Sequence, residues 1–158
     1  MRIMISLTAA LLAGPALATD GASTDAPVDP VALWQETPEQ VFEAKDVDLD
    51  AFRWVARPIV VFADTPADPR YREQMELLAA RPGELNARDV IIITDTAPAE
   101  ESALRQKLRP RGFMVALIGK DGGVKLRKPF PWNVREFSRS IDKMPLRQEE
   151  LRSRADTD

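Results

Sequence analysis

The 158-residue chain contains no cysteine and no histidine. Without cysteine it has no thiol nucleophile, disulfide, iron–sulfur cluster or CxxC redox pair, and without histidine it has no Ser-His-Asp triad or imidazole metal ligand. We therefore expect no catalytic residue of these kinds, no metal and no cofactor. With 44% hydrophobic and 30% charged residues, the chain is suited to one ordinary domain that needs no disulfide to be stable.

The first eighteen residues have the pattern of a secretory signal peptide. Arg2 precedes an apolar run over residues 3–13, and a small residue, Ala18, ends the pattern at a cleavage site. A membrane-spanning helix needs about 20 apolar residues, and Gly14-Pro15 interrupts this run. We expect a bacterial Sec-type signal peptide cleaved after Ala18. The product would be periplasmic or secreted, with no transmembrane segment after cleavage.

Residues 19–48 form an acidic leader that precedes the main domain. Residues 19–30 are small, acidic and proline-containing, which is typical of a flexible segment. Residues 38–45 begin with a proline and contain two apolar anchors, and they predict a short helix. We expect the folded domain over residues 49–152 and a charged tail over residues 153–158.

Three almost wholly apolar runs, at residues 58–63, 90–94 and 113–118, predict strands that are covered on both faces. Because right-handed crossovers connect such strands, we expect these three strands to be mutually parallel. Residues 119–123 (GKDGG) predict a hairpin turn rather than a phosphate-binding loop, because they precede a strand and not a helix. Residues 124–128 alternate apolar and basic side chains, which indicates an edge strand with one wet face.

Three helices are predicted between and after these strands. The first follows the cap Asp68, the second covers residues 97–108 after a cap at Asp95 or Thr96, and the third follows the cap Asn133. The resulting order is β-α-β-α-β-β-α, with a central mixed sheet of about four strands and helices on both faces. This is the order of an α/β protein with the thioredoxin-like fold.

Three stretches resemble a known family, domain of unknown function 4174. They are RWVARPIVVFADTPADPRY at residues 53–71, GFMVALIGKDGGVKLR at residues 112–127 and IDKMPLRQEEL at residues 141–151. The resemblance implies a thioredoxin-like or peroxiredoxin-like fold over roughly residues 49–152, and it carries no established catalytic residue. The loop that holds the two cysteines of a thioredoxin corresponds to residues 64–68, which contain none. The resemblance therefore supports the scaffold and argues against thiol chemistry.

Polar residues follow the first two predicted strands. Ligands of open α/β sheets bind beyond the carboxyl ends of the strands, where Asp95 and Thr96 follow the second strand. The candidate ligand-binding residues after the first strand are Asp64, Thr65, Asp68 and Arg70. The same residue types are typical of a helix cap and a turn, so a structural role is the alternative.

Charge is divided unevenly along the chain. Residues 19–104 contain 7 Lys and Arg against 18 Asp and Glu, a net −11, whereas residues 105–147 contain 12 against 3, a net +9. The candidate basic surface consists of Lys107, Arg109, Arg111, Lys125, Arg127 and Lys128. Such a surface would meet an anionic envelope surface or an acidic envelope protein, unless the basic half pairs with the acidic half within the molecule. We expect no nucleic acid partner, because basic and aromatic residues are not interleaved.

The sequence predicts an exported, non-redox thioredoxin-like domain that acts as a binding or interaction module in the cell envelope. Two alternatives stand beside it. One is a thiol-independent enzyme that uses the carboxylates at the end of the first strand, and the other is a purely structural envelope protein.

Overall fold

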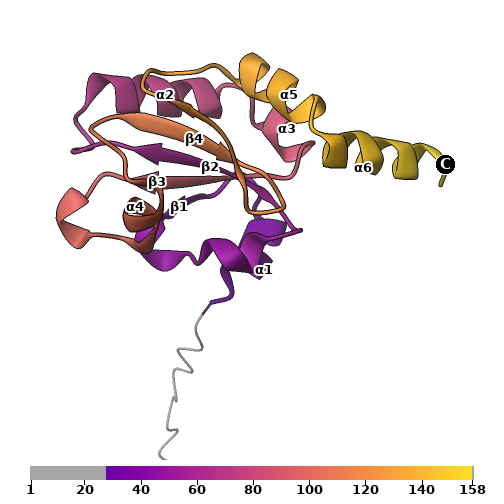
Figure 1. Cartoon of the computed structure of the whole chain (residues 1–158), viewed down its shortest axis with the longest axis horizontal. Coiled ribbons are helices and arrows are strands. Elements are labelled where there is room, and N and C mark those ends of the chain that lie inside the picture. Colours follow the sequence, from indigo (N-terminus) through magenta and orange to yellow (C-terminus); the bar gives the residue numbers. More distant parts are fainter. Residues whose placement is uncertain (1–27, 158) are drawn as a thin grey trace, which may run out of the picture.

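The computed structural model describes residues 28–157, so the expected signal peptide and most of the expected leader lie outside the described residues. This part of the chain forms one twisted sheet between two layers of helices (Figure 1). The α/β, thioredoxin-like prediction is confirmed, with five strands in the sheet instead of four. None of the helices over residues 28–157 is long and apolar enough to cross a bilayer.

The sheet has the strand order β1-β3-β2-β4-β5. Its strands are β1 Val41–Glu43, β2 Arg57–Phe62, β3 Val90–Asp95, β4 Met114–Ile118 and β5 Val124–Lys128. β1 and β2 pair with β3 in parallel, whereas β4 is antiparallel to both β2 and β5. The GKDGG hairpin and the edge position of β5 are therefore confirmed, and Gly122 adopts a positive φ of 81° in that turn.

The direction of β4 corrects the expectation of three mutually parallel strands. β4 lies beside β2 and runs the opposite way. The helix before it, α4 Ala103–Leu108, has six residues and is about 9 Å long, less than half the roughly 20 Å of a six-residue strand. Because this helix cannot carry the chain back along the sheet, β4 starts where β3 ended, with Met114 opposite Phe62.

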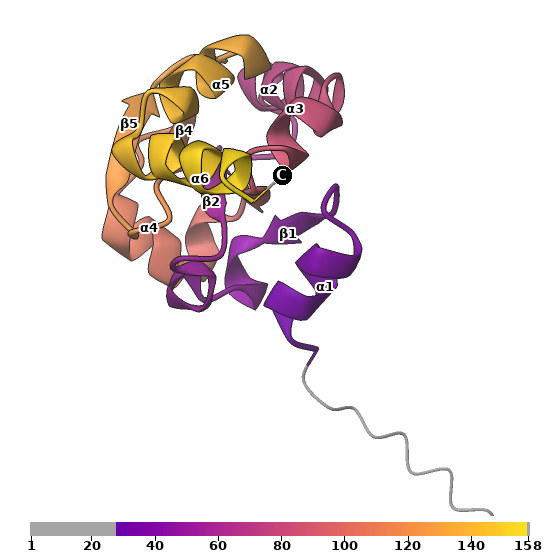
Figure 2. The ribbon, with the colours of Figure 1, turned by 90° about the vertical axis from the view of Figure 1, so that its right-hand side faces the viewer.

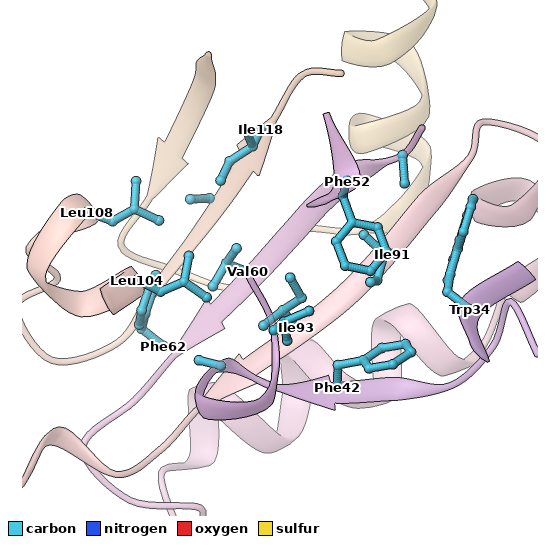
Figure 3. Packing of buried hydrophobic residues seen from close by; sticks show 14 residues of the cluster. Trp34, Phe42, Phe52, Val60, Phe62, Ile91, Ile93, Leu104, Leu108 and Ile118 are labelled. Carbon is cyan, nitrogen blue, oxygen red and sulfur yellow. The ribbon is translucent and has the colours of Figure 1, made fainter. Parts of the chain in front are cut away.

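Both faces of the sheet are covered by helices. One layer contains α1 Pro30–Glu36, the short 3-10 helices η1 Ala44–Asp46 and η2 Leu49–Phe52, and α4. The other layer contains α2 Pro69–Ala79, α3 Pro82–Asn86 and α5 Val134–Asp142. Alternation along β2 supplies both cores: Val60 and Phe62 face the first layer, and Ile59 and Val61 face the second. Figure 3 shows the first core, in which Phe42 and Trp34 approach Phe52 edge to face.

The N-terminal part of the domain is more ordered than expected. α1 lies within the expected leader, and β1 replaces the short helix expected over residues 38–45. Phe42 pairs with Ile93 of β3 and packs its ring against Phe52. The edge of β3 gives this segment backbone partners and a buried anchor, which outweigh a weak local helix preference.

Two of the three predicted helices are confirmed, and the middle one is corrected. Asp68 and Asn133 cap α2 and α5 as expected. The expected helix over residues 97–108 instead contains a 3-10 turn, η3 Pro98–Glu100, a left-handed Glu101, and then α4 with Ser102 as its cap. Asp95 accepts from the Ala97 nitrogen at 3.3 Å, but its carboxylate also bonds Ser102 and the Arg105 side chain, and the cap of α4 is Ser102.

The charged segment after α5 also forms more structure than expected. An eleven-residue helix, α6 Pro145–Ala155, extends from the body of the domain and past residue 152, where the domain was expected to end (Figure 1). Its residue Arg147 is buried, so the helix is attached by ionic contacts rather than by an apolar stripe.

Candidate functional site

The structure brings the predicted ligand residues together at the carboxyl end of β2, but most of their polar groups are already bonded. The Asp68 carboxylate accepts hydrogen bonds from the Arg70 backbone nitrogen at 2.9 Å and from Arg70 Nη2 at 2.9 Å. The hydrogen bond from the Arg70 side chain lowers the pKa of Asp68. Thr65 Oγ1 accepts from the Ala67 nitrogen at 3.2 Å. These two residues therefore cap α2 and close its preceding turn.

Asp64 is exposed, as are Thr65 and Arg70. Its Oδ2 lies 3.9 Å from the point where a side chain on Gly112 would begin, and Gly112 has a positive φ of 66°. The Arg70 guanidinium lies 5.5 Å from the centre of the Phe113 ring. The loop after β2 and the residues before β4 thus meet at this edge, but the group has no free pair of carboxylates for acid–base catalysis.

Asp95 has a buried structural contact instead of the open position expected for a ligand residue. Its side chain is 3% exposed and its Oδ1 lies 2.7 Å from Arg105 Nε. Arg105 Nη2 also donates to the Ala63 carbonyl oxygen at 2.6 Å. This ion pair ties α4 to the ends of β2 and β3.

A pocket of about 280 Å³ opens at the same edge, between β1, β3 and the start of α2. Its polar lining includes Glu43, Tyr71, Asp95, Thr96, Glu100 and Ser102. Asp64, Thr65, Asp68 and Arg70 do not line this pocket, so the structure separates them from Asp95 and Thr96. Over residues 28–157, no three acidic side chains come close enough together to hold a metal ion.

Three of the candidate basic residues lie on β5, and the other three lie on or just after α4. Arg127 Nη1 donates to the Leu108 carbonyl oxygen at 2.7 Å, which brings the end of α4 against the strand. Arg127 is opposite Ala116 and therefore faces the α4 layer, whereas Lys128 is opposite Val115 and faces the α5 layer. We name this group the basic edge: Lys107, Arg109, Arg111, Lys125, Arg127 and Lys128.

A buried ionic network at the opposite end of the sheet is absent from the sequence predictions. Arg57 is 1% exposed and donates from Nη2 to Glu150 Oε1 at 2.9 Å. Lys120 Nζ lies 2.9 Å from the same oxygen, and Arg147 Nη1 lies 3.3 Å from Glu150 Oε2. Burial raises the pKa of Glu150, but hydrogen bonds from Lys120 and Arg57 outweigh it and lower the pKa from 4.5 to about 2.

A signal for this network was present in the sequence. Arg57 begins an otherwise apolar strand, and each of the three stretches that resemble the 4174 family supplies at least one member of the network. The pairing itself joins residues 57 and 150, which no local pattern connects.

Comparisons with known proteins agree with this description. A family model described as Domain of unknown function (DUF4174) matches residues 48–150. A solved structure of Plasmodium yoelii thioredoxin peroxidase I is similar to this chain with a TM-score of 0.51 and 15% sequence identity, over 65% of this chain and 80% of that chain. At this identity the similarity shows the fold alone. No curated protein matches the chain in sequence.

Proposed function

Because the chain belongs to the DUF4174 family and has a thioredoxin-like fold without cysteine, we propose that it is an exported, non-redox interaction module of the cell envelope. Its partner in this proposal is an anionic lipid surface, which it binds through the basic edge. The observation that carries the proposal is that strands from the acidic part of the sequence form one side of the sheet and strands from the basic part form the other side.

The strand order supports this separation. β1, β3 and β2 come from the acidic part of the sequence, and β4 and β5 come from the basic part. Figure 2 shows β1 and β5 on opposite sides of the domain. Lys125, Arg127 and Lys128 therefore lie on the edge strand β5, at the other edge of the sheet from β1, and their charges add together there.

Most side chains of the basic edge have no carboxylate partner in the part of the chain that the structure describes. Among residues 28–157, Lys125 is the single member with a carboxylate within 4 Å, and that partner is Asp121 of the same turn. The sequence left open the alternative that these six residues pair with the acidic part of the chain. Over the described residues, none of the six has a carboxylate of that acidic part within 4 Å. Unpaired cations at one edge attract an anionic surface and lose that attraction as salt increases.

Exposed apolar side chains beside the basic edge favour lipid over an acidic protein. Phe130, next to the strand end at Lys128, is 51% exposed, and Val124 at the start of β5 is 37% exposed. Cations beside exposed aromatic and aliphatic groups suit the boundary between lipid headgroups and acyl chains.

The experiment is co-sedimentation of the purified chain with vesicles of phosphatidylglycerol or of phosphatidylcholine over a salt series. The test variant is Lys107→Glu/Arg111→Glu, because neither side chain is held by an ion pair within residues 28–157. The matched control is Arg152→Glu/Arg154→Glu, which changes the net charge equally on α6. Each basic residue near an anionic membrane contributes about 1 kcal/mol, so the test variant should bind at least about 30-fold more weakly.

Salt-sensitive binding to phosphatidylglycerol that the control retains and the test variant loses would support the proposal. Equal losses of vesicle binding in both variants would show that binding depends on the net charge of the chain and not on the basic edge. Absence of binding at low salt would overturn the lipid proposal, and a purely structural envelope protein predicts that result.

A further inference from the structure

A second positively charged feature lies between α2 and α5, apart from the basic edge. It is a pocket of about 390 Å³, into which α2 and the two residues after it contribute Leu77, Ala80 and Arg81. α5 contributes Val134, Arg135 and Arg139. Three arginines and three apolar residues thus line one cavity, and none of these residues belongs to the basic edge.

The guanidinium groups have hydrogen-bond donors to spare. Arg81 donates from Nη1 to Glu84 Oε1 at 2.7 Å, and Arg139 donates from Nη1 to Glu136 Oε1 at 3.0 Å. Arg135 has no ion pair within residues 28–157. A guanidinium carries five N–H donors, so most of the donors at this pocket are unused, and Glu136 is the one carboxylate that lines it.

The backbone on the two sides of the pocket is held in place by the buried Gln74. Gln74 of α2 is fully buried, and its side chain donates to the Trp132 carbonyl oxygen at 2.9 Å and accepts from the Trp132 nitrogen at 2.8 Å. This pair of bonds holds the residues before α5 against α2, and Val134 and Phe137 are buried below. Figure 2 shows α5 beside α2 and α3. A site with fixed walls loses less entropy when it binds.

We propose that this pocket binds a phosphomonoester, with the phosphate on Arg81, Arg135 and Arg139 and the organic part against Leu77, Ala80 and Val134. A phosphomonoester carries nearly two negative charges and three terminal oxygens, and guanidinium groups bind such oxygens in pairs. A single carboxylate would use fewer of the donors. The apolar floor accepts a short carbon chain, which inorganic phosphate lacks.

The experiment is isothermal titration of the purified chain at physiological salt with glycerol 3-phosphate, inorganic phosphate and, as a blank, glycerol. The test variant is Arg135→Gln/Arg139→Gln. The control is Arg152→Gln, because Arg152 is exposed and paired with the residue three positions earlier, as Arg139 is. We expect saturable binding of glycerol 3-phosphate, weaker binding of inorganic phosphate, and a loss of about tenfold in affinity for each arginine removed.

A second arm separates a soluble ligand from a lipid headgroup. Vesicles of phosphatidic acid present a phosphomonoester, whereas vesicles of phosphatidylglycerol present only a phosphodiester. This arm uses the Lys107→Glu/Arg111→Glu background, in which binding through the basic edge is removed. If phosphatidic acid binds there more tightly than phosphatidylglycerol, and Arg135→Gln/Arg139→Gln removes the difference, the pocket binds a phosphomonoester on a lipid. Failure of both glycerol 3-phosphate and phosphatidic acid to bind, or equal binding by the test variant, would overturn the proposal.

The two proposals can fail separately. The Lys107→Glu/Arg111→Glu variant should retain binding of glycerol 3-phosphate, because its changed residues do not line the pocket.

Discussion

Replacement of Glu150 by glutamine should destabilise the whole domain, although Glu150 lies on a helix that extends from its body. Glu150 accepts hydrogen bonds from Arg57 and Arg147 and lies 2.9 Å from Lys120 Nζ. Arg57 is almost completely buried in the central strand β2. Glutamine keeps the shape of the side chain but leaves this buried cation with Asp89, 3.9 Å away, as its remaining carboxylate.

Two independent routes give a similar magnitude for this loss. A pKa of Glu150 lowered from 4.5 to about 2 corresponds to about 3 kcal/mol of stabilisation, at roughly 1.4 kcal/mol per pH unit. Removal of one partner from a buried ion pair costs about 3 to 5 kcal/mol. We therefore expect Glu150→Gln to lower the free energy of unfolding by about 3 kcal/mol.

The assay is urea unfolding of the wild type, of Glu150→Gln and of the control Glu149→Gln at several pH values. Glu149 is its neighbour on α6 and is 68% exposed, so its replacement should cost less than about 0.5 kcal/mol. The pKa of Glu150 is lower in the folded chain than in the unfolded chain. Its contribution is thus complete above about pH 4.5 and is lost as the pH falls through about 2.

The difference between the wild type and Glu150→Gln should therefore close over that pH window. A loss below about 1 kcal/mol at neutral pH would refute the reasoning, because it would show that Arg57 does not need this counter-charge. A loss of the same size at pH 7 and pH 2 would refute it as well, since the cause would then be packing rather than charge.

Three further predictions, two of them with a control substitution, test other parts of the structure by the same urea assay. Asp95→Asn should lower the free energy of unfolding by about 3 kcal/mol, because it leaves Arg105 without its carboxylate partner. Asp64→Asn, at an exposed position, should change it by less than about 0.5 kcal/mol. Similar values for the two variants would contradict a structural role of the Asp95–Arg105 ion pair. Asn133→Ala should cost about 1 kcal/mol by removing the cap of α5, and Asn133→Ser should restore most of it. Gly122→Ala should cost about 1 kcal/mol because φ is 81° there, and an unchanged midpoint would show that the hairpin tolerates another turn.

Local patterns predicted most of the elements in the second half of the chain. The cap Asn133 and the apolar spacing after it predicted α5, and the glycines of residues 119–123 predicted the hairpin, because capping and turn geometry depend on neighbours in sequence. The errors fell where a distant partner decides the outcome. β1 exists because β3 offers a free edge, and α4 starts only at Ser102, which caps the helix while the Arg105 side chain pairs with the distant Asp95.

The sequence alone determined which chemistry is impossible, since the absence of cysteine and histidine is a matter of composition. It also determined that positive charge is concentrated after residue 104. Only the tertiary structure decided how that charge is used, because the strand order places β4 and β5 together at one edge and brings Arg57 to Glu150, 93 positions away. Electrostatic contacts depend on distance in space and on burial, and neither is a local property of the chain.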